Sequence, residues 1–442
     1  MSTNTTGTPA ISFSGLGSGI DTASIINALM RIERLPIDRI ESDKTRIKQK
    51  QGVVQEINGL LGKLRDAAAA MYAPDALKAK TATSGDATVA TASVGPQAAA
   101  GTYNVVVTAL AQAHTTASTA APALTAGQAL DITVGGETVS VTVEDGDTLQ
   151  GFADRINGTD GAGVSASVIN DKLVLISAES GAGGAITLGG SAAAGFGFAT
   201  TQAGQDAAAT VNGLAVTSSG NTIEGAINGV ALSLGKVGST TVTVGADHAA
   251  SAKTAQAFVD AYNGVVSNIR AATAYDAATK TAGTLQGDSS ISSLGGQLRG
   301  IAGAAVSGLG GAYDSLAQIG ITAARDGTLT LDQGAFQAAL SADPGAVAAV
   351  FGRDDGDAVI GATDGIARQI QSFASSFSTD ILSARLTGYT ASLGRLDEKI
   401  SSLESIMDLK EQRLRAQWTA MEKAVTQFQS QGADLAARLS QL

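Results

Sequence analysis

The chain has 442 residues, of which 54 are glycine, none is cysteine and only 4% are aromatic. This length predicts two to four domains. The formal net charge of −11, with no basic stripe, excludes a nucleic-acid partner, which requires clustered lysine and arginine. Acidity also opposes docking on an anionic membrane surface, and the sequence has no apolar run long enough to span a bilayer.

The first predicted element is a flexible arm over residues 1–20, with a hinge formed by Gly15, Gly17 and Gly19. These glycines lack the full pattern of a nucleotide-binding loop, which excludes that kind of site. A helix capped by Asp21 or Thr22 should follow, and Pro36 is expected to interrupt or kink it.

A second helix is predicted over residues 38–71, because apolar side chains recur there with a seven-residue period. The repeat consists of Ile40, Ile47, Val54, Leu61 and Ala68, joined in its later half by Ile57, Leu64 and Met71. Pro74 marks the expected end of this helix.

Residues 101–244 change character and predict antiparallel β structure, in two small domains. Short Val- and Thr-rich runs are separated by residues typical of tight hairpins. The expected turns are Gly135-Gly136, Asn170-Asp171, Asn212-Gly213 and Asn228-Gly229.

Helical periodicity returns over residues 252–275, and Asp288 should cap a further helix. A hairpin is predicted over residues 319–331 with its turn at Asp326-Gly327. Asp343-Pro344 then begins a short helix that should end near Phe351.

The last segment carries the longest heptad pattern in the chain. One row of apolar side chains comprises Leu386, Leu393, Ile400, Met407, Leu414, Met421, Phe428, Leu435 and Leu442. The second row comprises Tyr389, Leu396 and Leu403 and then moves by one position to Trp418, Val425 and Leu439. The seam therefore shifts between Met407 and Leu414.

This long helix needs a partner. Each large apolar side chain contributes roughly 1.5–3 kcal/mol when buried, whereas ordering each residue costs about 1–2 kcal/mol in backbone entropy. Nine side chains spread over residues 386–442 cannot offset that cost alone. The partner is the amino-terminal helix, a neighbouring subunit or both, so we expect the two ends of the chain to meet.

No group of residues indicates catalysis, a cofactor or a metal. His114 and His248 are isolated, and zinc sites need three or four ligands. The acidic runs 144–147 and 354–357 could bind calcium, but neither fits an EF-hand loop. Their Asp and Gly residues are more typical of turns, so we expect no enzyme activity and no bound metal.

Several blocks of the sequence resemble the flagellar hook-associated protein 2 family, the filament-cap proteins. The blocks are residues 11–22, 101–107, 163–167, 258–263, 287–289, 316–322 and 326–332, and their order along the chain also matches. The resemblance covers nearly all of the chain and is weakest over residues 114–206.

The resemblance implies an α+β multidomain fold with a terminal α-helical coiled coil and a helical leg domain, between which antiparallel β-rich head domains are inserted. The terminal segments would be 1–40 plus 408–442, and the leg domain, with small β-hairpins, 41–113 plus 246–407. The head region would be 114–245, divided into about 116–200 and 201–245.

The resemblance also implies a function. Such a protein forms a ring-like homo-oligomer at the distal end of the extracellular filament, where it promotes folding and polymerisation of exported flagellin and prevents its loss. Its partners would include flagellin, hook–filament junction proteins, an export chaperone and the flagellar type III export apparatus. It would leave the cell unfolded without a cleaved signal peptide, which agrees with the lack of cysteine.

Two alternatives stay open. One is a hook–filament junction protein or flagellin-like subunit, although the blocks at 258–263 and 316–332 resemble the cap type. The other is an adhesin whose β-rich head binds a host surface.

Overall fold

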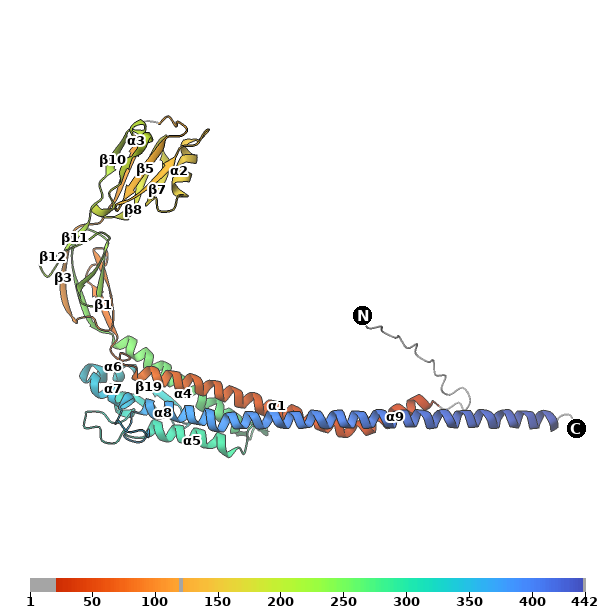
Figure 1. Cartoon of the computed structure of the whole chain (residues 1–442). Coiled ribbons are helices and arrows are strands. Elements are labelled where there is room, and N and C mark those ends of the chain that lie inside the picture. Colours follow the sequence, from red (N-terminus) through yellow and green to blue (C-terminus); the bar gives the residue numbers. More distant parts are fainter. Residues whose placement is uncertain (1–20, 119–121, 440–442) are drawn as a thin grey trace. The chain divides into compact units, whose positions relative to one another are not determined.

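The computed structural model describes residues 21–118 and 122–439 and divides the chain into two compact units (Figure 1). Unit 1 comprises residues 1–69, 257–331 and 349–442, and unit 2 comprises residues 70–256 and 332–348. The combination of long terminal helices with antiparallel sheets confirms the predicted fold class.

The α-helices are α1 (Thr22–Tyr72), α2 (Leu149–Asn157), α3 (Gly190–Phe196), α4 (His248–Thr273), α5 (Ser289–Gly303), α6 (Gln333–Ala342), α7 (Pro344–Gly352), α8 (Ile366–Ser376) and α9 (Ser383–Leu439). Two short 3₁₀ segments are η1 (Ala182–Gly184) and η2 (Ala317–Ile319), and η3 (Phe377–Leu382) is a π-helix.

The first β domain of unit 2 consists of β1 (Lys80–Ser84), β2 (Ala90–Val94), β3 (Gly101–Ala109), β11 (Ala207–Val211), β12 (Leu214–Ser218), β13 (Thr222–Ile227), β14 (Val230–Leu234) and β15 (Gly238–Ala246). One sheet has the order β1-β15-β3-β11-β12 and the other β13-β14-β2. A single core of mainly Val, Ile, Leu and Ala side chains is shared by both sheets.

The second β domain consists of β4 (Ala113–Ser118), β5 (Ala129–Val134), β6 (Glu137–Thr142), β7 (Val164–Ile169), β8 (Lys172–Ser180), β9 (Thr187–Gly189) and β10 (Phe198–Gln202), with α2 and α3. Its sheets have the orders β10-β4-β8-β7 and β6-β5-β9. Phe152 and Phe196, whose ring centroids are 5.7 Å apart, lie in a core of their own.

All four predicted hairpin turns in unit 2 are confirmed by strand pairing. Val134 pairs with Glu137 and Ile169 pairs with Lys172 across two of them. The Asn212-Gly213 turn joins β11 to β12, and the Asn228-Gly229 turn joins β13 to β14. Asn170, Asp171 and Asn212 adopt positive φ, which asparagine and aspartate tolerate better than most residues.

The strand pairing does not follow the domain boundary expected at residue 113. Strands β1 and β3 lie before that boundary, but both pair with β15, and β3 also pairs with β11. Residues 80–109 therefore form a β domain with residues 207–246, in two sheets around one core, rather than belonging to a helical domain. The reason is that these pairings join segments more than 90 residues apart, which local sequence patterns do not specify.

Unit 1 is a bundle of helices from both ends and the middle of the chain. The helical periodicity predicted over residues 252–275 corresponds to α4, whose buried side chains include Phe258, Tyr262 and Val265. Phe258 makes an edge-to-face contact with Phe351, with ring centroids 6.2 Å apart. Further buried side chains come from the apolar faces of α1, α5 and α8.

Pro36 does not interrupt α1, so the expectation of two separate amino-terminal helices is wrong. The helix runs unbroken from Thr22 to Tyr72, and Asp21 caps its start by accepting a hydrogen bond from the Ser24 backbone N–H at 3.0 Å. A proline removes one backbone hydrogen bond. Buried side chains on both sides of it, Ile26 and Ile37, keep the same face of α1 covered and outweigh that loss.

A π-helical turn keeps the apolar face of the last long helix continuous. Residues 366–439 form one helical rod in which η3 separates α8 from α9. The buried side chains Phe377 and Leu382 are five residues apart, and five α-helical residues turn about 140° past a full turn. The wider π turn brings Leu382 back to the face of Phe377.

The junction between α7 and α8 depends on a glycine. A Cβ atom at Gly365 would lie 2.2 Å from the backbone oxygen of Phe351. We expect Gly365→Ala to lower the free energy of unfolding of unit 1 by about 2–3 kcal/mol, since a backbone atom cannot move aside as a side chain can. Denaturant unfolding followed by circular dichroism measures this. Gly361→Ala is the matched control, because its nearest neighbouring atom is 3.9 Å away, and equal stability of the two variants would contradict the prediction.

Candidate assembly interface

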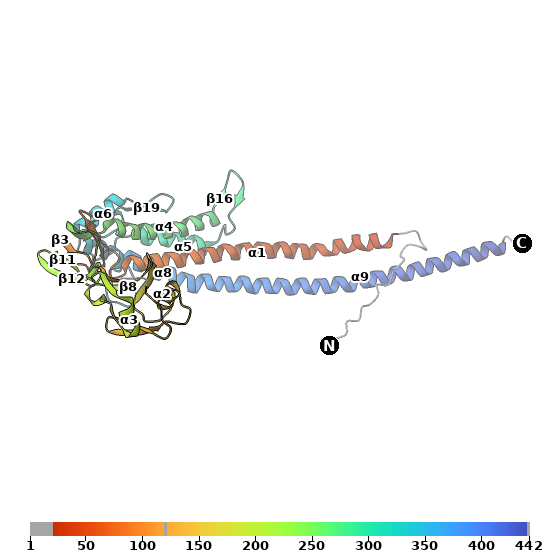
Figure 2. The ribbon, with the colours of Figure 1, turned by 90° about the horizontal axis from the view of Figure 1, so that it is seen from above.

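The first and last long helices lie side by side and antiparallel, as the views in Figures 1 and 2 show. Glu33 Oε1 lies 2.6 Å from Lys410 Nζ, and Lys44 forms an ion pair with Asp397. Ser378 Oγ donates to Asn58 Oδ1 at 2.5 Å. Successively later residues of α1 thus contact successively earlier residues of α9 and η3, as in an antiparallel helix pair. The two long helices near the ends of the chain therefore pack together, as the heptad patterns predicted.

Most of the predicted seam of α1 is buried. Val54, Ile57, Leu61 and Leu64 are at most 1% exposed, and Ile40 is also buried. Ile47 is half-buried. The predicted side chains of α1 thus lie on the covered face of the helix, where burial of each contributes roughly 1.5–3 kcal/mol to stability.

The seam of α9 is only half covered. Its half-buried residues are Leu386, Tyr389, Leu393, Leu396, Ile400, Leu403, Met407, Leu414, Trp418 and Val425. Glu411 is half-buried as well, four residues after Met407, so the covered face follows the predicted shift of the seam. A helix seam that a single chain covers only in part can gain further burial from other subunits.

Towards its carboxyl end, α9 exposes the rest of the seam. Met421, Phe428 and Leu435 are 37%, 72% and 61% exposed. Continuing the register of the Glu33–Lys410 pair brings Thr22, the first residue of α1, to the level of about Met421. Beyond that level, no described part of α1 runs beside α9.

A second apolar stripe lies exposed on the first third of α1. Ile25, Leu29, Ile32 and Leu35 are spaced as on one side of a helix and are 36–62% exposed. The described part of the chain leaves this face uncovered. Like the end of α9, it is a surface that a neighbouring helix could cover.

Parts of the predicted site fall outside the described residues. Gly15, Gly17 and Gly19, the predicted hinge, precede residue 21, and Leu442 follows residue 439. Leu439 ends α9, but its side chain is not described. Their roles stay predictions.

A bidentate salt bridge, which the sequence did not predict, joins α9 to the helical bundle. Arg385 Nη1 and Nη2 lie 2.6 Å and 2.5 Å from the two carboxylate oxygens of Asp288. Asp288 also caps α5, accepting from the Ile291 N–H at 3.2 Å, as predicted. Burial alone would lower the pKa of Arg385, but the hydrogen bonds and charge of Asp288 outweigh burial and raise it. This pair fixes the base of α9 against α5.

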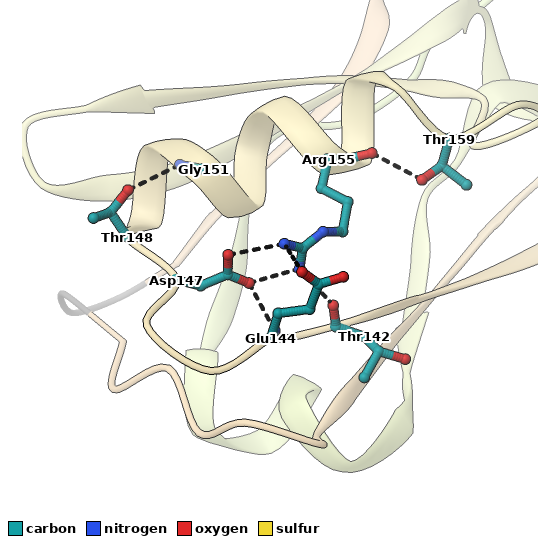
Figure 3. Close-up of polar contacts among 7 residues, drawn as sticks. All are labelled: Thr142, Glu144, Asp147, Thr148, Gly151, Arg155 and Thr159. Atoms are coloured by element: carbon teal, nitrogen blue, oxygen red, sulfur yellow. Dashed lines mark hydrogen bonds and ion pairs between the residues drawn. The ribbon is translucent and has the colours of Figure 1, made fainter.

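The acidic run 144–147, weighed as a calcium site, already holds a cation from the chain itself (Figure 3). Arg155 donates to Asp147 Oδ2 and Oδ1 at 2.6 Å and 2.9 Å, and its Nη2 lies 2.9 Å from Glu144 Oε2. Thr148, next in the chain, caps α2 through the Gly151 N–H at 3.1 Å. The cluster therefore anchors the start of α2, in keeping with a turn.

The Arg155 contact makes the second β domain sensitive to acid. Hydrogen bonds from Arg155, followed by the Glu144 backbone N–H, hold the pKa of Asp147 below its usual 3.8. The folded state therefore binds this proton more weakly than the unfolded chain, so the stabilisation is present above pH 3.8 and is lost as the pH falls through the folded pKa.

We expect Asp147→Asn to lower the unfolding temperature of this domain near pH 7, and the deficit to shrink as the pH falls below 3.8. Thermal unfolding at pH 7 and at a pH below 3.8 measures it. Asp145→Asn is the control because Asp145 is exposed and makes the same change of charge. A deficit that is the same at both pH values would show that Asp147 acts through something other than its charge.

Within the described ranges, no helix is long and apolar enough to cross a membrane.

His114 is buried in the second β domain, where its Nδ1 accepts from the Ile186 N–H at 3.3 Å. Its Nε2 lies 3.3 Å from Thr200 Oγ1. Each ring nitrogen of His114 therefore has a polar partner within this domain.

Comparison with known proteins shows what the chain resembles as a whole. Residues 18–114 match the flagellar hook-associated protein 2 N-terminus, and residues 204–430 match the flagellar hook-associated protein 2 C-terminus. Residues 129–179, in the second β domain, match the flagellin hook IN motif.

Full-length relatives and a solved structure agree. Flagellar hook-associated protein 2 of Escherichia coli K12 is 29% identical, covering 95% of this chain and 96% of the relative. The A-type protein of Pseudomonas aeruginosa is 26% identical, covering 97% of each. The crystal structure of the D1-D2-D3 domains of the flagellar cap protein FliD from Escherichia coli has a TM-score of 0.59 and 30% identity, covering 76% of this chain and 99% of that one. Because the C-terminal match alone spans more than half of the sequence, the chain belongs to the flagellar hook-associated protein 2 family.

Proposed function

We propose that this protein is a structural subunit of a flagellar filament cap. It forms a homo-oligomer at the distal end of the filament, promotes folding and polymerisation of exported flagellin and prevents its loss. The observation that carries the proposal is the pair α1 and α9, whose apolar seam a single chain covers only in part. The likeness to a solved flagellar cap protein supports the same assignment.

The energetics of the helix pair favour assembly. Met421, Phe428 and Leu435 are 37%, 72% and 61% exposed in the single chain, and completing the burial of all three would contribute about 3–5 kcal/mol in total. The stripe formed by Ile25, Leu29, Ile32 and Leu35 is exposed as well. Subunits that pack these helices together cover both surfaces, and the long helices then become the part of each subunit that docks into the filament end.

The remaining partners follow from this role. Flagellin is the subunit whose folding and polymerisation the cap would promote, and hook–filament junction proteins would be further partners. An export chaperone and the flagellar type III export apparatus would deliver the chain to its extracellular site. The role is structural, so we propose neither a catalytic residue nor a cofactor.

Complementation of a strain that lacks its own cap tests the proposal. The full chain should restore filament growth, and a chain truncated before residue 408 should not, because it lacks most of the exposed seam. Filament length by electron microscopy and flagellin released into the medium are the two readouts. Hydrogen exchange of the two β domains, which the truncation does not touch, is the control for folding.

Normal filaments grown with the truncated chain would contradict the proposed role of α9. Failure of the full chain to restore growth, together with a monomeric state at every concentration, would contradict the cap function itself. Subunits counted by electron microscopy in rings of the purified protein would establish the number per cap.

A further inference from the structure

Three carboxylates converge in the loop that joins α7 to α8. Asp354 and Asp355 follow α7, and Asp364 lies two residues before α8. One oxygen from each lies within 4.8 Å of the other two. The loop closes on itself through the Gly365 N–H, which donates to the Arg353 carbonyl at 2.9 Å.

Asp364 separates this cluster from an ordinary acidic turn. Its side chain is 1% exposed, and its Oδ2 accepts from the Gly361 N–H at 2.8 Å. Its Oδ1, however, is buried and accepts no hydrogen bond from any described residue. Arg368 Nε lies 3.7 Å from that oxygen, which is too long for a hydrogen bond. A buried carboxylate oxygen without a hydrogen bond is costly, so a further positive partner would stabilise it.

The positive charges nearby do not balance the three carboxylates. Arg368 Nη1 lies 2.9 Å from Asp354 Oδ2, so this guanidinium serves two of the carboxylates. Arg353 Nη1 instead donates to the Ser307 carbonyl at 2.7 Å. Asp355 is held by the Thr363 hydroxyl, and the charge of Arg353 also acts on it, so two arginines stand beside three carboxylates. The cluster therefore keeps an excess of negative charge.

We propose that this loop binds one calcium ion through Asp354, Asp355 and Asp364. Calcium takes six to eight oxygen ligands at about 2.3–2.6 Å, so two of its ligands on opposite sides are up to about 5 Å apart. The three carboxylates meet that limit. A long irregular loop also suits calcium better than magnesium, which demands a stricter octahedral geometry. Calcium competes with Arg368 for Asp354, because both bind the same carboxylate.

Only the folded chain brings these groups together. The run 354–357 by itself is typical of a turn. It contains a hydrogen bond of the kind found in turns, in which the Gly356 N–H donates to Asp354 Oδ1 at 3.0 Å. Asp364 is nine residues after Asp355, but with Arg353 and Ala358 at the first and sixth positions the segment does not follow the EF-hand pattern. Its arrival beside the other two depends on the closure of the loop.

Isothermal titration of the full chain with calcium chloride tests the site. We expect one ion per chain with a dissociation constant on the order of 10⁻⁴–10⁻³ M, as in extracellular calcium modules, and magnesium binding at least about tenfold more weakly. Asp355→Asn should weaken calcium binding by at least about tenfold, since it removes one charged ligand. Asp355 is exposed, so this variant should fold.

Asp357→Asn is the matched control. It lies in the same loop and makes the same change of charge, but its carboxylate caps the Val359 N–H at 2.8 Å and is not part of the cluster. Its calcium affinity should stay within about threefold of the parent. Arg368→Gln should raise the affinity, because it removes the competing cation.

Absence of calcium binding up to about 10 mM would overturn the proposal. Equal losses of affinity in Asp355→Asn and Asp357→Asn would overturn it too, because general loop charge rather than the three carboxylates would then attract the ion. Circular dichroism of each variant confirms that folding is retained.

Discussion

Replacing Met421, Phe428 and Leu435 together with glutamine is expected to abolish assembly without changing the stability of the single chain. The three side chains are already 37%, 72% and 61% exposed, so the isolated chain has little packing to lose. Completing their burial on assembly would contribute about 3–5 kcal/mol per subunit, which corresponds to a loss of roughly a hundredfold to a few thousandfold in association. Analytical ultracentrifugation and complementation of a strain without its own cap measure the effect.

The matched control changes the opposite face of the same helix. Each control position lies two residues after one of the seam positions, about 200° around α9 from it. The control positions are Lys423, Ser430 and Ala437. Replacing them with glutamine should leave association unchanged. Loss of assembly in both triple variants would mean that the far end of α9 acts through its helicity or charge and not through its seam.

Removing one residue should have opposite effects at two places in the same helical rod. Deleting Asp380 reduces the distance from Phe377 to Leu382 from five residues to four, so η3 can become an ordinary α-helix with the seam still in phase. The exposed Asp380 contributes no packing of its own. We expect this variant to fold, assemble and support filament growth.

Deleting Glu404, which is equally acidic and exposed, should abolish growth. Every later residue of α9 then turns by about 100°, which removes Leu414 and Trp418 from the face beside α1. The Lys410–Glu33 ion pair is lost as well. Filament length with each variant decides the matter. If the Asp380 deletion also blocks growth, the π turn has a role beyond keeping the seam in phase.

The two deletions are expected to differ because burial of the seam matters more than helix propensity in this rod. The heptad pattern of α9 was evident from the sequence because it depends only on residues a few positions apart. The π turn was not, since Ile381 and Leu382 both fit an apolar stripe. Only the packed bundle buries Leu382 and leaves Ile381 40% exposed.

The same division applies in the β domains. Asn212-Gly213 and Gly135-Gly136 mark hairpins because adjacent residues set the turn geometry. The partners of β1 and β3 carry no such local signal, since many short Val- and Thr-rich strands of this chain have similar patterns. Their place beside β15 and β11 depends on which side chains complete a shared core.

What the sequence alone determined is local: the α+β fold class, the caps at Asp21 and Asp288, the hairpin turns and the two heptad rows that require a partner. Tertiary structure decided how far those rows are covered, that α1 continues through Pro36, and which charges meet. Arg385 reaches Asp288, Arg155 fills the acidic run before α2, and Asp364 joins Asp354 and Asp355. Each of these depends on segments that are brought together only when the apolar faces on either side are buried, and no pattern of neighbouring residues records that event.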